Sequence, residues 1–168
     1  MNDGCSVLQL VDWISDLDEV GDEDLQLFAN TLGQRIHVAI VSPEYLPLIE
    51  KRIKIVESRL SKHRIVPFES VEAGDIILLK QTSGMIQMVA MAGFAEYSST
   101  ATGDDISSVL APHFDALAYQ PGFLEAKQDA RYVSLIGLND VQRVSDTRMR
   151  RRRRSGWDVF APERPSVL

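Results

Sequence analysis

Hydrophobic residues recur at helical spacing in the first 33 residues of the chain. Residues 6–17 (SVLQLVDWISDL) place apolar side chains three and four positions apart, and residues 22–33 (DEDLQLFANTLG) repeat this pattern. That period indicates two amphipathic helices, and Gly33 is the residue type that most often follows the end of a helix. The sequence therefore predicts a helical pair ahead of the main domain.

From residue 35 onward, short apolar runs separated by turn residues predict strands rather than long helices. The expected strands cover residues 35–42, 54–60, 71–80, 84–97, 131–138 and 156–160, with a further strand start at 141–144 after a turn at Asn139–Asp140. Pro43 opens a short predicted helix, and residues 102–113 predict another. Roughly six strands joined partly by hairpin turns favour an α+β fold, a small mixed β-barrel with flanking helices, over a doubly wound sheet.

A chain of 168 residues is long enough for one domain with an appendage. We expect residues 1–33 to form an acidic N-terminal helical extension, residues 34–161 to form the barrel domain, and residues 162–168 to form a C-terminal tail.

Composition and motifs exclude several classes of protein. The single Cys5 rules out a disulfide framework within the chain. No apolar run approaches the roughly 20 residues that span a bilayer, and the first residues do not resemble a secretory signal. The three histidines lie far apart, and neither a phosphate-binding glycine loop nor a zinc-protease motif is present. We expect a cytoplasmic protein with no membrane association, no metal and no cofactor.

Charge is segregated along the chain, although the net charge is −6. Residues 1–33 carry eight acidic residues and no Lys or Arg, whereas residues 34–64 carry seven basic residues against three acidic ones. Arg148 and Arg150–Arg154 add six positive charges near the C-terminus. A local basic surface attracts phosphates even on an acidic protein, so nucleic acid is a candidate partner.

Residues 54–64 (KIVESRLSKHR) hold the most concentrated charges within an extended segment. Strict alternation would separate Lys54 from Glu57 and Arg59, but a bulge or turn would bring the three together. A glutamate between two cations stays ionised and can orient the arginine, whose guanidinium holds a phosphate or a base edge. The alternative is a surface strand with ordinary ion pairs, each worth at most about 1 kcal/mol.

The segment KIVESR (residues 54–59) resembles the K-x-x-E-x-R signature of the activating signal cointegrator homology (ASCH) domain, a family of the PUA-like superfamily. Residues 35–161 follow the order of that family, with Gly74-Asp75-Ile76 resembling its G-D-x-I strand. The resemblance implies a PUA-like barrel with Lys54, Glu57 and Arg59 lining a cleft. Members of the superfamily bind RNA or modified bases, and a few ASCH proteins are enzymes.

Two positions depart from that family pattern. Arg52 stands where glycine usually precedes the lysine. Glu57 stands where the amidohydrolase members carry a threonine nucleophile, which argues against their activity on acylated cytidine.

Three functions are compatible with these residues, and the first is binding of RNA, single-stranded or structured, with DNA as a further candidate ligand. The residues expected to contact nucleic acid are Lys54, Glu57, Arg59, Lys62, Arg64, Arg150, Arg151, Arg152, Arg153 and Arg154. The aromatic residues expected near this surface are Tyr45, Phe68 and Trp157.

The second function is a hydrolase acting on RNA, as a ribonuclease, or on a modified nucleoside. Its catalytic residues would be Lys54, Glu57 and Ser134, with Tyr132 as another nearby hydroxyl. The third function is a protein-interaction module, in which residues 6–32 dock a protein partner or cover the basic cleft.

Overall fold

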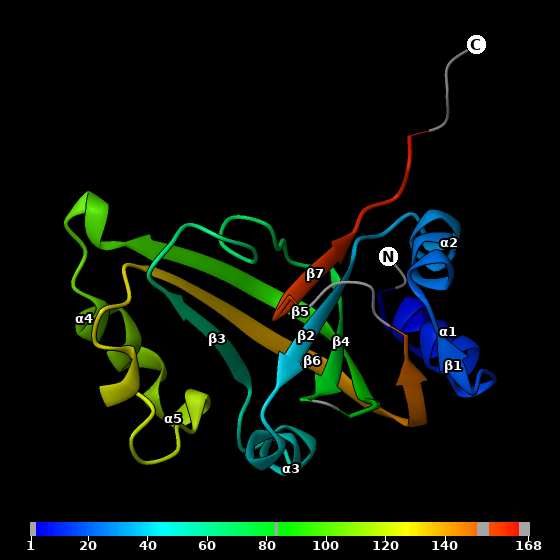
Figure 1. Cartoon of the computed structure of the whole chain (residues 1–168), viewed down its shortest axis with the longest axis horizontal. Helices are drawn as coiled ribbons and strands as arrows, with labels where there is room; N and C mark the ends of the chain where they lie inside the picture. The colour runs from blue at the N-terminus through cyan, green and yellow to red at the C-terminus, as the bar shows by residue number, and fades with distance from the viewer. Residues whose placement is uncertain (1–2, 83, 151–154, 165–168) are drawn as a thin grey trace.

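The structure, a computed structural model, describes residues 3–82, 84–150 and 155–164 as a strongly curved sheet with helices at both ends (Figure 1). Its strands are β1 (Glu19–Val20), β2 (Ile36–Val41), β3 (Val56–Ser61), β4 (Ile76–Gln81), β5 (Ile86–Ser99), β6 (Tyr132–Met149) and β7 (Trp157–Phe160). Its helices are α1 (Asp3–Ser15), α2 (Asp22–Leu32), α3 (Leu46–Glu50), α4 (Ile106–Leu110) and α5 (Phe114–Leu117), with 3₁₀ turns η1 (Pro43–Tyr45), η2 (Thr100–Thr102), η3 (Ala111–His113) and η4 (Glu125–Lys127). The predicted α+β class is confirmed.

The sheet leaves a seam between β3 and the strands β2 and β7. Its order is β1-β6-β5-β4-β2-β7, and β3 pairs with the first part of β6. Because β3 pairs only with β6 and β7 only with β2, each has one edge without a strand partner among the described residues. The mixed, curved sheet agrees with the predicted PUA-like barrel, with β3 and β7 facing its open side.

β6 corrects one detail of the sequence prediction. The expected turn at Asn139–Asp140 lies inside a single strand of 18 residues. Asp140 adopts the left-handed region (φ 49°), and the pairing with β5 shifts register between Val89 and Met91. Such an irregularity bends a strand without ending it, so the polar pair marks a kink.

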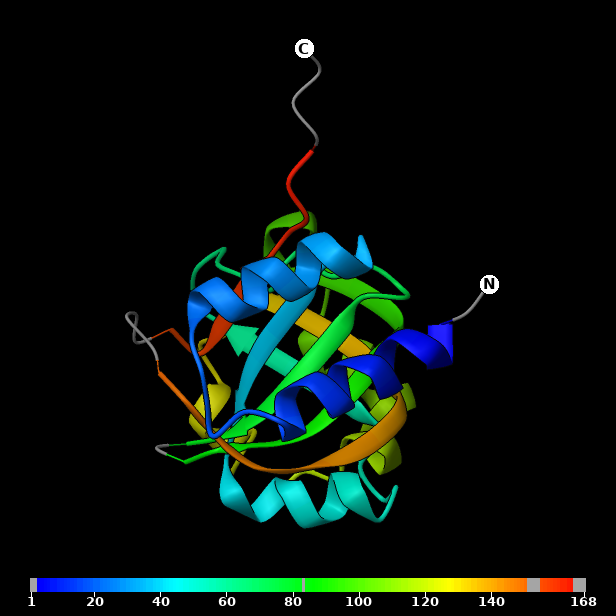
Figure 2. The same ribbon diagram turned by 90° about the vertical axis from the view of Figure 1, so that its right-hand side faces the viewer.

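α1 and α2 lie across one face of the sheet (Figure 2). Apolar side chains of both helices are buried in a cluster with residues of the strands. Leu10 and Ile14 of α1 and Leu25 of α2 share a cluster with Ile36 and Ile76 of the strands, all fully buried. Each such side chain stabilises the fold by about 1.5–3 kcal/mol through burial. Two helices are thus present where the sequence predicts them. The proposed domain boundary at residue 33 stays a prediction.

α4 and α5 lie at the opposite end of the molecule from α1 and α2 (Figure 1). Val56 and Leu60 of β3 pack against Leu110 of α4 and Leu117 of α5 in a separate buried cluster. Because side chains alternate across a strand, Glu57 and Arg59 point away from that cluster toward the seam. None of the helices in the described part of the chain is long and apolar enough to cross a membrane.

Candidate functional site

The end of α3 directs Lys54 into the protein. The amides of Ile53 and Lys54 both donate to the Leu48 carbonyl (2.9 and 3.0 Å), which closes the helix. Arg52, between them and the helix, adopts the left-handed region (φ 60°). This is the conformation that a glycine takes without strain at a helix end, and it turns the chain back toward the core.

Lys54 is an almost fully buried cation, with 2% of the residue exposed. Its Nζ donates to the Leu117 carbonyl at the end of α5 (2.7 Å) and lies 4.9 Å and 5.6 Å from the ring centroids of Tyr45 and Tyr119. Burial lowers the pKa of the Lys54 ammonium, and the Glu57 carboxylate partly opposes that shift. A carbonyl, two aromatic faces and one carboxylate thus replace the water around this charge.

Glu57 lies between the two cations, as the sequence predicted. It is 7% exposed, and its oxygens lie 3.7 Å from Lys54 Nζ and 3.3 Å from Arg59 Nε. The Arg59 guanidinium donates to the Ile40 carbonyl of β2 (2.6 Å) and lies 5.1 Å from the Trp157 ring of β7. Arg59 therefore bridges the seam of the barrel from β3 to both facing strands.

A buried polar chain holds Trp157 beneath Arg59. The Trp157 indole donates to His37 Nδ1 (3.0 Å), and because an indole only donates, the ring proton of His37 is on Nε2, which donates to Asp75 (2.8 Å). Burial alone would raise the pKa of the Asp75 carboxyl, but the hydrogen bonds from His37 and the Glu72 amide and the charge of Arg35 lower it. The chain fixes the indole plane on which the guanidinium lies.

These groups open onto a central pocket of about 190 Å³. Besides Lys54, Glu57 and Arg59, its walls include Tyr45, Ser58, Leu60, Tyr119, Phe123 and Lys127. The rings of Tyr119 and Phe123 stack with centroids 4.4 Å apart. Ser58 Oγ and the Tyr119 hydroxyl share a hydrogen bond of 2.5 Å, and burial raises the pKa of the Tyr119 phenol, which keeps it protonated.

A second cavity of about 420 Å³ borders the central pocket and is called here the basic hollow. Arg59, Lys62 and Lys127 line it, together with Ile65 and Trp157. Lys62 pairs with Asp129 at 4.0 Å, and both side chains are exposed. Ile65 is 59% exposed and the adjacent Val66 is 44% exposed, so apolar side chains accompany the positive charges.

Ser134 is not part of the central pocket. It lies directly opposite Arg59 in the β3–β6 pairing and lines the basic hollow with 2% of its surface exposed. The other predicted hydroxyl, Tyr132, packs its ring against Phe68 instead. The register of β6 therefore brings Ser134 to Arg59 rather than to Lys54.

Of the other predicted basic residues, Lys62 lines the basic hollow, whereas Arg64 and Arg150 line neither that hollow nor the central pocket. Arg64 forms an ion pair with Glu69 and lies over the Phe68 ring. Arg150 lies beside Glu19 and Glu23 (both 3.7 Å), at the end of the molecule that holds α1 and α2. The contact of Arg150 with nucleic acid stays a prediction, and Arg151, Arg152, Arg153 and Arg154 lie outside the described residues.

The structure does not support the alternative in which residues 6–32 cover the basic cleft. No residue of this segment lines the central pocket or the basic hollow. Its apolar side chains are buried against the far end of the sheet, so α1 and α2 cannot reach the seam while this core is intact. Docking of a protein partner on their outer face stays a prediction.

Ser58, Tyr119, Phe123 and Lys127 are among the residues of the central pocket that sequence reasoning missed. Tyr119 and Phe123 follow α5, where Ala118 ends the helix in the left-handed region (φ 48°). Their nearest signal in the sequence is the run of three aromatic residues from position 114 to 123, with no period that shows which way they point.

Solved structures of the ASCH protein from Zymomonas mobilis have the same fold as this chain. The TM-score to that protein is 0.52, at 15% identity over 67% of this chain and 73% of that chain. Its serine-to-alanine variant gives 0.54 over 69% and 75%, and its tyrosine-to-phenylalanine variant gives 0.53 over 67% and 75%, each at 15% identity. No family model and no curated protein sequence matches the chain. The ASCH resemblance is confirmed at the level of the fold.

Proposed function

We propose that this chain, which has the fold of the ASCH domain, binds RNA and receives one unpaired base in its central pocket. The observation that carries the proposal is the row of buried Lys54 and Glu57 and half-buried Arg59 at the wall of a pocket with aromatic sides. These residues supply charge and hydrogen-bonding groups at positions where apolar side chains would be enough to stabilise the fold.

Stability does not account for this charge row. Removing charges from water costs several kcal/mol per ion, and well-packed apolar residues would stabilise the same position as well or better. Lys54 and Glu57 lie in a cavity and not in a closed core, and burial lowers the pKa of the lysine. Charged groups with shifted pKa values in a pocket are typical of functional sites.

The shape and chemistry of the pocket suit a single base. Sequence-specific RNA recognition uses unstacked bases that lie on aromatic rings and expose their edges to hydrogen-bonding groups. Tyr119 and Phe123 supply the aromatic side, Glu57 supplies acceptors and Arg59 supplies donors. A cavity of about 190 Å³ receives a base and not a duplex, so the bound strand is unpaired at this position.

The basic hollow supplies the backbone contacts that such a strand requires. Arg59, Lys62 and Lys127 border it, and phosphate contacts from such side chains hold a nucleic acid in place without reading its sequence. The exposed Ile65 and Val66 add apolar surface beside these charges. The strand thus passes through the hollow while one base enters the pocket.

Binding to a labelled single-stranded RNA octamer, followed by fluorescence anisotropy, tests this function. We expect clear binding at low salt and a slope of log affinity against log salt on the order of −2, since three cations at about −0.7 each contact phosphates. A DNA octamer of the same sequence is the control for the sugar. Undetectable binding of RNA at low salt would refute the proposal.

A second candidate, cleavage of RNA, is favoured by one observation. The lysine with the lowered pKa shares the central pocket with the hydrogen-bonded hydroxyls of Ser58 and Tyr119. A lysine of this kind can give or take a proton at a reacting oxygen. Gel electrophoresis of the octamer after incubation distinguishes binding from cleavage. Intact RNA supports binding alone. Fragments that form with the wild-type chain but not with Lys54→Met support catalysis.

A further inference from the structure

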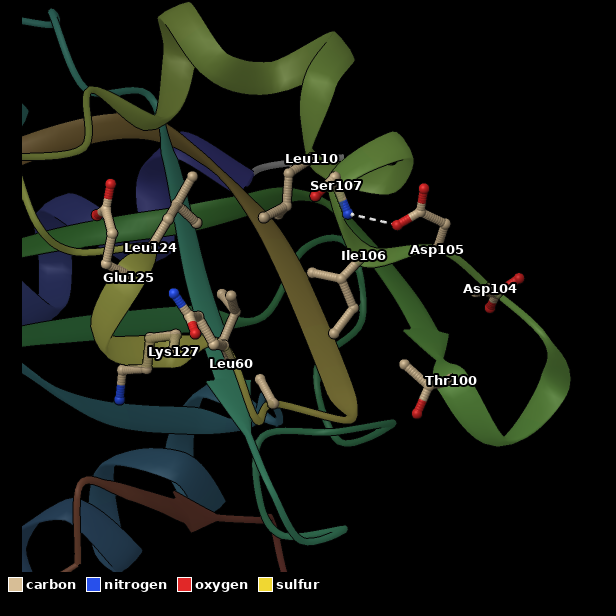
Figure 3. A pocket seen from close by; sticks show the side chains of 12 residues that line it. Leu60, Thr100, Asp104, Asp105, Ile106, Ser107, Leu110, Leu124, Glu125 and Lys127 are labelled. Atoms are coloured by element: carbon tan, nitrogen blue, oxygen red, sulfur yellow. Dashed lines mark hydrogen bonds between the residues drawn. The ribbon is translucent and has the colours of Figure 1, made fainter.

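A third cavity, called here the side pocket, lies beside the central pocket between α4 and the segment that contains η4. It has a volume of about 470 Å³. In Figure 3, Leu124, Glu125 and Lys127 lie on one side of it, and Ile106 and Asp105 lie on the other. Neither the binding of one base in the central pocket nor the cleavage of RNA requires this cavity.

The side pocket and the central pocket meet at two residues. Leu60 and Lys127 line both cavities, and both also line the basic hollow. Leu60 is almost buried, while Lys127 is exposed at the end of η4. No carboxylate of the described residues lies within ion-pair distance of the Lys127 ammonium, so its charge is available at the junction of the three cavities.

Five of the twelve residues that line the side pocket are apolar. They are Leu60, Ile106, Leu110, Leu124 and Ala130, and Leu110 is fully buried. Apolar surface beside convergent polar groups is typical of small-molecule sites, and a planar base fits such a space.

Carboxylates are three of the seven polar or charged residues that line the side pocket, beside Thr100, Ser107, Lys127 and Gln128. Asp104 accepts from the Ser99 amide (3.1 Å) and Thr102 Oγ1 (3.0 Å), and Asp105 caps α4 by accepting from the Ser107 amide (3.2 Å). Both side chains are therefore fixed by the protein, and Glu125 adds a third carboxylate. Ionised carboxylates only accept hydrogen bonds, so they repel a phosphate and pair with an amino group, as they do with the amino group of cytosine.

We infer that the side pocket binds a second base, one that carries an exocyclic amino group, and that Lys127 contacts the phosphate between the two bases. This inference rests on the proposed RNA binding and deepens it. The ligand then comprises at least two consecutive nucleotides, and adenine, cytosine or guanine is preferred over uracil in the side pocket.

Competition against the labelled RNA octamer tests the inference with small ligands. We expect the dinucleotides ApA and CpC to compete at least about fivefold more strongly than AMP and CMP, because the further base buries apolar surface against Leu60, Ile106 and Leu124 of the side pocket. The increase in affinity from UMP to UpU should be smaller than the increase from CMP to CpC. Equal gains for UpU and CpC would overturn the assignment of the carboxylates, and dinucleotides no stronger than mononucleotides would overturn the second base.

Two variants locate the effect. Ser107→Trp fills the side pocket from the exposed first turn of α4. ApA and CpC should then compete no more strongly than AMP and CMP, and the competition by AMP and CMP should be the same as with the wild-type chain. Ala111→Trp, which introduces the same side chain at an exposed position after α4 and outside the pocket lining, is its control and should retain the gain. An unchanged gain in Ser107→Trp would overturn the inference alone, whereas failure of the wild-type chain to bind the octamer would overturn the proposed function with it.

Discussion

Replacing Arg59 with alanine should lower the affinity for single-stranded RNA at least about tenfold, which corresponds to a loss of about 1.4 kcal/mol. Arg59 borders both the central pocket and the basic hollow, and it crosses the seam from β3 to Ile40 and Trp157. Its planar guanidinium can hold a base edge or a phosphate with two hydrogen bonds, which alanine cannot replace. The measurement is the same anisotropy titration at constant salt.

Arg143→Ala is the matched control for that titration. Arg143 carries the same charge on β6, pairs with Glu50 at the surface (2.9 Å), and lines neither the central pocket, nor the basic hollow, nor the side pocket. Arg59→Lys separates charge from geometry, because it keeps the charge and loses the planar fork. Equal affinities for Arg59→Ala and Arg143→Ala, with both proteins folded by circular dichroism, would contradict the placement of RNA at the seam.

Replacing Glu57 with glutamine should lower the free energy of unfolding by about 3 kcal/mol, because it leaves a buried cation without its counter-charge. Lys54 is 2% exposed and has Glu57 as its only carboxylate within 4 Å among the described residues. Glutamine keeps the volume of the side chain, so the loss reflects charge rather than a cavity. Urea denaturation of the wild-type and variant chains measures it.

Lys54→Met should cost less than Glu57→Gln, because Glu57 keeps its contact with Arg59. The double variant should lose less than the sum of the two single losses, since it removes the lysine that Glu57→Gln leaves unpaired. Glu50→Gln, which affects only an exposed ion pair, is the control and should cost under about 1 kcal/mol. If Glu57→Gln lowers the free energy of unfolding no more than Glu50→Gln does, the prediction is contradicted, and water must reach Lys54 and Glu57 in solution.

The charged row could be predicted because it lies within six consecutive residues. Lys54, Glu57 and Arg59 converge through local events, the left-handed turn at Arg52 and the alternation of β3. The strands were predictable for a similar reason, since each has its own apolar period. The turn predicted at Asn139–Asp140 was wrong, because a left-handed residue in a polar pair occurs both in turns between strands and in kinks within one strand.

The opposite wall of the pocket could not be predicted, because it depends on tertiary packing. Tyr119 and Phe123 come from an irregular segment whose position is set by the burial of Leu110 and Leu117 against β3. The position of Arg150 also depends on long-range packing. A count of charges along the chain does not show that Glu19 and Glu23 lie beside that arginine at the other end of the sheet.

The two tryptophans of the chain provide the most direct test of whether RNA binds at the seam. Trp157 lies under Arg59 at the site, whereas Trp13 packs against Phe28 between α1 and α2. A ¹H–¹⁵N spectrum resolves one indole N–H signal from each, and Trp13→Phe assigns them. On titration with the RNA octamer, the Trp157 signal should move and the Trp13 signal should stay in place. Movement of Trp13 with an unchanged Trp157 would contradict binding at the seam.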